Sequence, residues 1–309
     1  MTFHVIVGAG APAIATARLL AERDEQVRLV SRSGNGPRHP RIEVIPLDAR
    51  DTDALVELVT GATALFNCAV SAYQTWPETL PPLFRSMLVA AERTEARYVM
   101  LGNLYGYGPH QGVLTEDHPL AAAGPKGKVR AQMWLEAERA FREGRVSVSE
   151  VRAAQFLGIG AVSVFTLTVQ PQVLAGRLAV VPQSLDLPHA YTAITDVART
   201  LVAVADDDRS WGHAWHAPVI SSTVRALAVQ LAELAGAPAP RLEEITEREE
   251  SVLSLASPLW GELHETRHMS HGPFEVSSAR VETTFGLKPA PLDQVLREAI
   301  GGPQRAGEI

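Results

Sequence analysis

The N-terminal segment carries a glycine-rich turn of defined spacing, Gly8-Ala9-Gly10-Ala11-Pro12-Ala13, or G-x-G-x-x-A. The turn follows the apolar run Phe3–Val7, which predicts a strand, and opens an alanine- and leucine-rich segment, which predicts a helix. In such a unit the first glycine permits a tight turn, the second lets backbone amides approach a pyrophosphate, and the alanine allows close packing of helix on strand. These six residues therefore predict a dinucleotide-binding loop rather than a turn without a ligand.

The residues after the second predicted strand, Val27–Ser31, distinguish between dinucleotides. An acidic residue there would accept hydrogen bonds from the adenosine ribose, but the sequence is Ser31-Arg32-Ser33. Arg32 can pair with a 2′-phosphate and the serines can donate to its oxygens, so the pattern favours NADPH over NADH. Asp48, after the third predicted strand, is a candidate for the adenine amino group, although an aspartate that opens a turn is equally expected there.

The elements that must position these residues alternate between strand and helix through the first half of the chain. The patterns predict strands over Phe3–Val7, Val27–Ser31, Ile42–Pro46, Ala64–Cys68 and Arg97–Leu101, and helices over Ile14–Glu22, Thr52–Val59 and Leu83–Arg93. Such alternation predicts the α/β class, with a doubly wound parallel sheet of the Rossmann type. Ala69, just after the fourth strand, is then a further candidate for contact with the dinucleotide.

The second half of the chain has a different pattern. A long amphipathic helix is predicted over Lys126–Glu143, and the 43 positions from 153 to 195 hold only two charged residues, Arg177 and Asp186. Part of this apolar stretch predicts buried strand, and the rest is a candidate pocket lining. Further helices are predicted over Ser222–Ala235 and Leu292–Ile300. We expect a dinucleotide-binding domain over 1–150, the remaining sheet strands and a smaller substrate-binding lobe over 151–300, and a mobile tail over 301–309.

Composition narrows the classes of partner. The 309 residues include 28 Lys and Arg against 35 Asp and Glu, a net charge of -7, which argues against a nucleic-acid or anionic-membrane partner. No uninterrupted apolar stretch approaches the ~18 residues that span a bilayer. The single cysteine, Cys68, cannot form an intrachain disulfide, so we expect a cytoplasmic protein.

Four further segments carry a family resemblance when taken in order with the glycine motif. They are Asn103-Leu104-Tyr105-Gly106-Tyr107-Gly108-Pro109, Leu114-Thr115-Glu116-Asp117-His118-Pro119, Arg152 to Gly158, and Thr195-Asp196-Val197-Ala198. Together they resemble the extended short-chain dehydrogenase/reductase superfamily, in its NAD-dependent epimerase/dehydratase-like branch. The resemblance spans nearly the whole chain and implies a nicotinamide-dependent enzyme.

The catalytic residues that the resemblance would supply are replaced. The family uses a Ser or Thr, a Tyr and a Lys, and the matching positions here hold Asn103, Lys126 and Arg130. Reduction of a ketone needs stabilisation of the developing alkoxide. The Asn103 amide can polarise a carbonyl, and Lys126 or Arg130 can offer positive charge to the oxyanion or to the nicotinamide ribose. We expect Lys126 to face the cofactor, with the proton coming from Lys126, from water or from a substrate hydroxyl. The alternative is a solvated basic face formed by Lys126, Lys128 and Arg130.

The scarcity of cationic residues between 153 and 195 favours a flat, apolar substrate over a sugar nucleotide. Reductases that keep this scaffold without the triad resemble tailoring enzymes of bacterial natural-product pathways, so we expect a small-molecule ketone of the aromatic polyketide, angucyclinone-like class. Two alternatives remain: a catalytically silent NADP(H)-binding redox sensor, and a sugar-nucleotide epimerase or dehydratase. A homodimer is also open, because family relatives often pair through helices like those near Pro82 and Lys126.

One segment matches a zinc-binding pattern, His264-Glu265-Thr266-Arg267-His268, or H-E-x-x-H. On a regular helix this spacing places two imidazoles one turn apart around zinc, with the glutamate as base. Because the dinucleotide scaffold already accounts for the chain, we interpret the match as coincidental and expect no metal.

Overall fold

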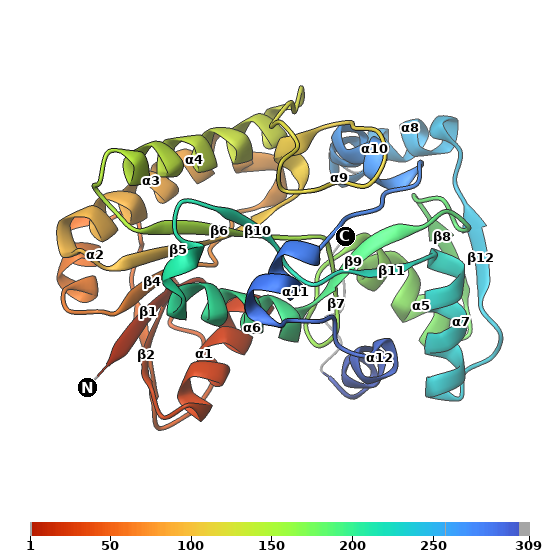
Figure 1. The fold of residues 1–309 in the computed structure, drawn as a ribbon. Coiled ribbons are helices and arrows are strands. Elements are labelled where there is room, and N and C mark those ends of the chain that lie inside the picture. The colour runs from red at the N-terminus through yellow and green to blue at the C-terminus, as the bar shows by residue number, and fades with distance from the viewer. Residues whose placement is uncertain (1, 257, 303–309) are drawn as a thin grey trace.

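A computed structural model describes residues 2–256 and 258–302, and it centres on a seven-stranded parallel sheet (Figure 1). The strand order is β10-β6-β5-β4-β1-β2-β3, so the order along the chain reverses between β1 and β4. This topology confirms the predicted doubly wound α/β class. The strands are β1 (Phe3–Val7), β2 (Gln26–Ser31), β3 (Ile42–Pro46), β4 (Ala64–Asn67), β5 (Arg97–Asn103), β6 (Val148–Ala153) and β10 (Ala214–His216).

Helices cover both faces of this sheet. One face packs against α2 (Thr52–Val59), α3 (Trp76–Thr94) and α4 (Pro125–Arg142), and the other against α1 (Ala11–Glu22) and α6 (Ile194–Asp206). Alternate residues of the central strands supply the two cores, since Val5 and Val7 belong to the first and Ile6 belongs to the second. Two single turns of 3₁₀ helix, η1 (Tyr73–Thr75) and η2 (Tyr105–Tyr107), follow the ends of β4 and β5.

A smaller lobe lies beside the carboxyl ends of the strands, on the right of Figure 1. It contains a three-stranded sheet in the order β11-β9-β7, a parallel pair β8 and β12, and helices that enclose a separate apolar core around Phe165, Tyr191 and Leu227. Its elements are β7 (Gln155–Leu157), the π-helical η3 (Phe165–Val169), α5 (Gln170–Leu174), β8 (Leu178–Val181), β9 (His189–Ala193), β11 (Ile220–Ser222), α7 (Val224–Ala235), β12 (Arg241–Glu244) and α12 (Leu292–Gly301).

A chain of short helices connects the lobe back to the main sheet. It consists of α8 (Glu247–Ala256), α9 (Pro258–Leu263), the 3₁₀ turn η5 (His264–Thr266) and α10 (Arg267–Ser270), and it lies next to the loop that precedes α4 (Figure 1). The two remaining elements are η4 (Asp208–Ser210) and α11 (Ala279–Phe285), whose Phe285 ring lies 4.7 Å from that of Trp215. The tail was expected over 301–309, but Gly301 still belongs to α12, and residues 303–309 lie outside the described residues.

Two helices, α3 and α7, begin at other residues than predicted. The helix expected from Leu83 begins at Trp76, ahead of Pro81 and Pro82, because the buried Trp76 ring anchors the first turn through its N–H to the Ser71 carbonyl, 3.1 Å away. The helix expected from Ser222 begins at Val224, since Ser222 ends β11 and the Thr223 hydroxyl accepts the Ala226 amide. In the described ranges, no helix is long and apolar enough to cross a membrane.

Candidate functional site

The glycine-rich turn joins β1 to α1 at the point where the strand order reverses. Gly8 has a φ of +119°, and a Cβ there would lie 2.7 Å from the Cys68 carbonyl oxygen, so only glycine lets β1 and β4 approach this closely. Gly10 is the N-cap of α1. The nearest atom to a Cβ placed on Gly10 would be Cδ of Pro12, at 3.8 Å. No side chain caps α1, and its first turn holds no acidic residue. This open helix N-terminus fits the pyrophosphate of a dinucleotide.

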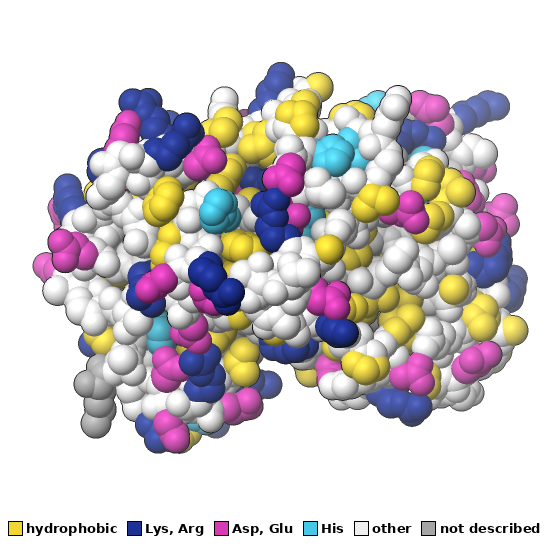
Figure 2. All heavy atoms as spheres, viewed as in Figure 1, with side chains coloured by type: hydrophobic (Ala, Val, Ile, Leu, Met, Phe, Trp, Pro, Cys, Tyr) yellow, Lys and Arg dark blue, Asp and Glu magenta, His cyan; other side chains and the backbone are white. Residues whose placement is uncertain are grey.

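The segment after β7 lies next to the glycine-rich turn. A Cβ on Gly160 would lie 3.2 Å from the Cβ of Ala11, and one on Gly302 would lie 2.7 Å from Ile159. The turn after β7 therefore lies between the start of α1 and the end of α12. In the space-filling view the outline is indented between these two helices, and cationic and anionic side chains alternate over the face shown (Figure 2).

The adenosine end of the expected site is formed by the loops after β2 and β3. Arg32 and Ser33 are exposed, and the Ser31 hydroxyl donates to the Asn35 carbonyl. Hydrogen bonds from the Arg50 side chain and backbone lower the pKa of Asp48 to about 2, with a smaller contribution from the charge of Arg32. Asp48 thus opens a turn and lies within the electrostatic reach of Arg32, as expected if the two loops share one ligand.

Asn103 and Lys126 belong to segments that pack directly against each other. Asn103 ends β5, and its Oδ1 accepts the amide of Tyr105 at 3.2 Å. A Cβ on Gly127, in the first turn of α4, would lie 2.6 Å from the Tyr105 carbonyl oxygen. The glycine at 127 therefore allows the start of α4 to lie against the turn that follows Asn103.

Two of the cationic side chains of α4, Lys126 and Arg130, face a cluster of three aromatic rings. Lys126 Nζ lies 4.7 Å from the centre of the Tyr73 ring, and the Arg130 guanidinium lies 4.5 Å from that of Trp76. Tyr105 completes the cluster through its hydroxyl, 3.3 Å from that of Tyr73. Lys126 is 3% exposed and Arg130 is partly buried, whereas Lys128 is exposed. A solvated basic face is therefore wrong for Lys126 and Arg130 and holds for Lys128.

Burial decides the protonation of these groups. Burial raises the pKa of the Tyr73 and Tyr105 hydroxyls, so both stay neutral. Burial also lowers the pKa of Arg130, whose Nε has no hydrogen-bond partner among the described residues. Its guanidinium nevertheless stays charged, because an arginine pKa starts far above neutral. The cluster thus presents neutral rings with two cations one helical turn apart.

The zinc-like segment has a different role in the structure. His264 and His268 lie on η5 and α10 rather than on one regular helix, and the described residues contain no group of three or more metal-ligating side chains. The Glu265 carboxylate accepts the backbone amides of Lys126 at 3.2 Å and of Gly127 at 2.8 Å. Glu265 therefore caps α4 from a position almost 140 residues later in the chain.

A second glutamate of the same segment reaches the Lys126 side chain. Glu262, on α9, forms an ion pair with Lys126 Nζ, and Glu265 lies 3.7 Å from the same atom. A Cβ on Gly124, the N-cap residue of α4, would overlap the Glu265 carboxylate. Sequence reasoning missed both glutamates, since the only signal was a zinc pattern with another meaning.

A buried polar network supports the ends of β5, β6 and β10. The Tyr107 hydroxyl receives a hydrogen bond from Arg152 at 2.5 Å and donates to His216 Nε2 at 2.8 Å. Arg152 also pairs with Glu150 at 2.6 Å. The Tyr107 phenol, at the end of η2, thus belongs to this network and lies outside the aromatic cluster.

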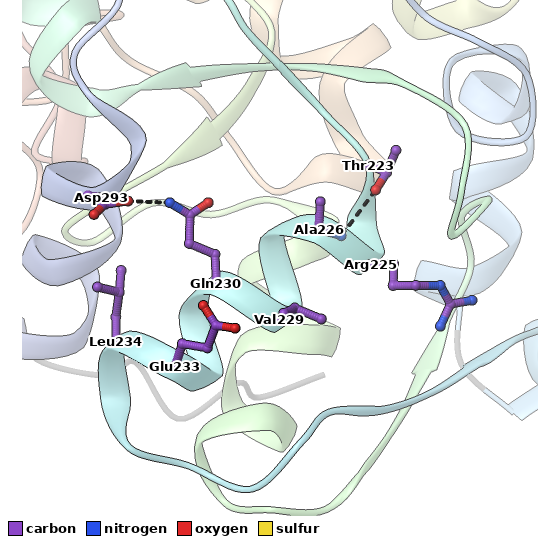
Figure 3. Close-up of a pocket in the computed structure, with 8 residues that line it drawn as sticks. All are labelled: Thr223, Arg225, Ala226, Val229, Gln230, Glu233, Leu234 and Asp293. Carbon is purple, nitrogen blue, oxygen red and sulfur yellow. Dashed lines mark hydrogen bonds between the residues drawn. The ribbon is translucent and has the colours of Figure 1, made fainter.

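The lobe carries an open depression of about 560 Å³ that is separate from these residues (Figure 3). It is lined mainly by α7, and a hydrogen bond joins Gln230 to Asp293 across it. It contains none of the residues predicted to bind the cofactor or to act in catalysis.

Comparison with known proteins supports the fold at low sequence identity. Neither a family model nor a curated protein matches the sequence. The Bordetella bronchiseptica enzyme WbmH in complex with NAD+ superposes with a TM-score of 0.76 at 19% identity, covering 99% of this chain and 100% of that one. The dTDP-glucose 4,6-dehydratase DesIV of Streptomyces venezuelae, with NAD bound, gives 0.77 at 18% identity and 96% coverage of both chains. The Bacillus cereus UDP-glucuronic acid 4-epimerase, in complex with NAD, gives 0.77 at 13% identity, covering 96% and 97%.

Each of these structural alignments covers nearly the whole length of both chains. The chain therefore has the fold of these NAD-bound enzymes, which include an epimerase and a dehydratase.

Proposed function

We propose that this protein is an NADPH-dependent ketoreductase acting on an aromatic polyketide ketone of the angucyclinone type. The observation that carries the proposal is the pair Lys126 and Arg130, which face the aromatic cluster beside Asn103 where the related family has a tyrosine and a lysine. Flat aromatic substrates stack on such rings, and a cation next to them stabilises an alkoxide. On this interpretation the chain resembles the angucyclinone ketoreductase of simocyclinone biosynthesis.

The residues present fit a bound dinucleotide. The α1 N-terminus is uncapped and unobstructed at Gly10, and Arg32 is exposed at the end of β2. NADPH would supply the hydride to the carbonyl carbon. Asn103 would orient the carbonyl through its amide, Lys126 would donate a proton to the oxygen, and Arg130 would stabilise its negative charge.

A sugar-nucleotide epimerase or dehydratase is the second candidate, favoured by what the solved neighbours act on. Against it, a sugar nucleotide needs cations for its diphosphate, and the lobe offers few. Arg177 is exposed on the turn before β8, and Arg225 is paired with Asp186 through two hydrogen bonds. The neighbours contain NAD, whereas Ser31-Arg32-Ser33 supports NADPH here.

The test is NADPH and NADH oxidation by the purified protein with a panel of aromatic polyketide ketones, product masses being checked in each case. UDP- and dTDP-hexoses are incubated in parallel and followed by NMR. We expect reduction of a ketone with NADPH preferred. Conversion of a hexose nucleotide would replace the proposal with the second candidate, and tight NADPH binding with no turnover would indicate a redox sensor.

Two variants separate the proposed roles. Lys126→Ala is expected to lower kcat by about a hundredfold, the usual contribution of a positioned proton donor. Arg32→Ala is expected to raise the KM for NADPH by about tenfold, the worth of one charge-assisted contact, with little effect on kcat. Equal binding of NADPH and NADH by the unaltered protein would contradict the role of Arg32.

A further inference from the structure

A proton donor that is buried needs a route by which it is reprotonated. Each reduction transfers one proton from the protein to the alkoxide, so an Nζ–H bond of Lys126 would break and an O–H bond would form. The Lys126 side chain is only 4% exposed. Direct exchange with bulk water is therefore obstructed, and a neighbouring acid must complete the cycle.

The groups that face Lys126 Nζ come from several elements, and most are unsuited to this task. Tyr73 presents its ring face, its hydroxyl points to Tyr105, and burial keeps both phenols neutral. Arg130, one turn along α4, stays charged. Glu265 is 14% exposed, and both its oxygens accept backbone amides at the start of α4.

Glu262 differs from all of these groups. Its carboxylate contacts Nζ, and its side chain is 28% exposed, seven times the exposed fraction of Lys126. It belongs to α9, whereas the cap of α4 is made by Glu265 on η5. Of the two carboxylates near Nζ in the described residues, it is therefore the more exposed, and its oxygens accept no backbone amide of α4.

We propose that Glu262 is a positioning and relay residue that takes a proton from water and returns it to Lys126 after each turnover. This inference rests on the proposed ketoreductase function. The charges balance: with Lys126 neutral, the Glu262 carboxylate takes a proton from a hydronium ion of the solvent, releasing water, and passes it to Lys126 Nζ, which restores the ion pair. Glu265 binds the first amides of α4 and so fixes the position of η5 and α9 against this helix. The two glutamates therefore have separate roles although they are three residues apart.

The first experiment needs no substrate. The sequence contains only three lysines, Lys126, Lys128 and Lys288, so ¹⁵N-lysine labelling gives three Nζ signals whose proton exchange with water is measured by NMR. Glu262→Gln keeps size and hydrogen bonding but cannot relay a proton. We expect Lys126 exchange to slow by about tenfold or more in this variant, while exchange at the exposed Lys128 and Lys288 is unchanged. Equal exchange in both proteins would overturn the relay.

The second experiment uses turnover. Glu262→Ala is expected to lower kcat without changing NADPH binding, and added acetate is expected to restore part of the loss in proportion to its concentration. A merely structural role would not respond to acetate. Glu265→Gln is the matched comparison, since it removes the other nearby charge, and its kcat is expected to be insensitive to acetate. Loss of activity in Glu262→Ala without any rescue would overturn the relay.

The two measurements distinguish failure of the relay from failure of the proposed function. Slower Lys126 exchange in Glu262→Gln with no ketone turned over by the unaltered protein would keep the relay and remove the ketoreductase assignment. If Glu262→Gln does not fold, Glu262→Asp, whose shorter carboxylate withdraws from Nζ, is expected to give intermediate exchange.

Discussion

Two helix N-termini at the same edge of the sheet, those of α1 and α4, have opposite surroundings. Both begin with a glycine N-cap, both have proline in the first turn, and neither is capped by a side chain of its own. At α1 the space before Gly10 is open, whereas at α4 the Glu265 carboxylate accepts two of the first amides. Similar local sequence features therefore give one helix N-terminus without a side-chain cap and one capped by a carboxylate from another segment.

This difference shows how the site divides its tasks. A helix N-terminus attracts anions through its unpaired amides and its dipole. The α1 end keeps this property for a ligand, while the α4 end uses it to hold α9 and η5 over Lys126. The proposed binding of the cofactor and the proposed placement of the proton donor would thus use the same physical effect at two positions.

The largest expected effect is on NADPH affinity, and it comes from placing a carboxylate at the N-terminus of α1, as Glu265 does at α4. Gly10→Asp places a carboxylate at the N-cap of α1, where a Cβ meets no close neighbour. Repulsion between this carboxylate and the pyrophosphate is expected to weaken NADPH binding by about a hundredfold, or about 3 kcal/mol. The free energy of unfolding is expected to rise by a few tenths of a kcal/mol, because aspartate caps a helix better than glycine.

Gly10→Asn is the control for this change, since it has the same size and caps the helix without a charge. Fluorescence titration with NADPH and urea denaturation measure the two quantities. Equal NADPH binding by the Asp and Asn variants would show that the α1 N-terminus does not hold the pyrophosphate.

The next largest expected effect is on the free energy of unfolding, and it concerns His216 in the buried network with Tyr107 and Arg152. Burial, countered only in part by a hydrogen bond to Ser277, lowers the pKa of His216 from 6.5 to about 3. The unfolded chain binds this proton below about pH 6.5 and the folded chain does not, so stability falls as the pH drops from 6.5 towards 3. At pH 5 the contribution reaches about 2 kcal/mol relative to neutral pH.

His216→Gln is expected to flatten this part of the stability curve. Urea denaturation of both proteins from pH 7 to pH 5 gives the difference in slope. NADPH binding at the α1 end is expected to change equally with pH in both, because the Tyr107–His216 pair joins η2 to β10 and includes none of the residues predicted to bind the cofactor. An unchanged slope of stability against pH in the variant would contradict the buried neutral imidazole.

The smallest expected effect is the loss of the α4 cap. Glu265→Ala is expected to lower the free energy of unfolding by about 1 kcal/mol, the usual worth of an N-cap. Glu265→Gln retains an acceptor oxygen and is expected to lose less. Urea denaturation measures both, and NADPH affinity is expected to be unchanged. A fall in NADPH affinity as large as that of Gly10→Asp would remove the distinction between the two helix ends.

Much of the first half was predictable because its signals are local. The strand–turn–helix unit around Gly8 and Gly10 and the strand boundaries at Ile42–Pro46 were correct from hydrophobic pattern and turn residues. The network of Tyr107, Arg152 and His216 was not predictable, since its members lie on three separate elements. The zinc pattern was interpreted as coincidental, and the role of its glutamate could be recognised only from the contact between Glu265 and α4.

The sequence by itself determined the fold class, the position of the glycine-rich turn and the presence of Asn103, Lys126 and Arg130 at the positions that the family resemblance assigns to catalysis. Only the tertiary structure decided what surrounds them: rings from η1, η2 and α3, and the glutamates of α9 and η5. The physical reason is the distance along the chain over which each signal acts. Hydrophobic periodicity and turn chemistry act over a few residues, whereas the environment of a buried charge is supplied by segments as far as 139 residues away, which only folding brings together.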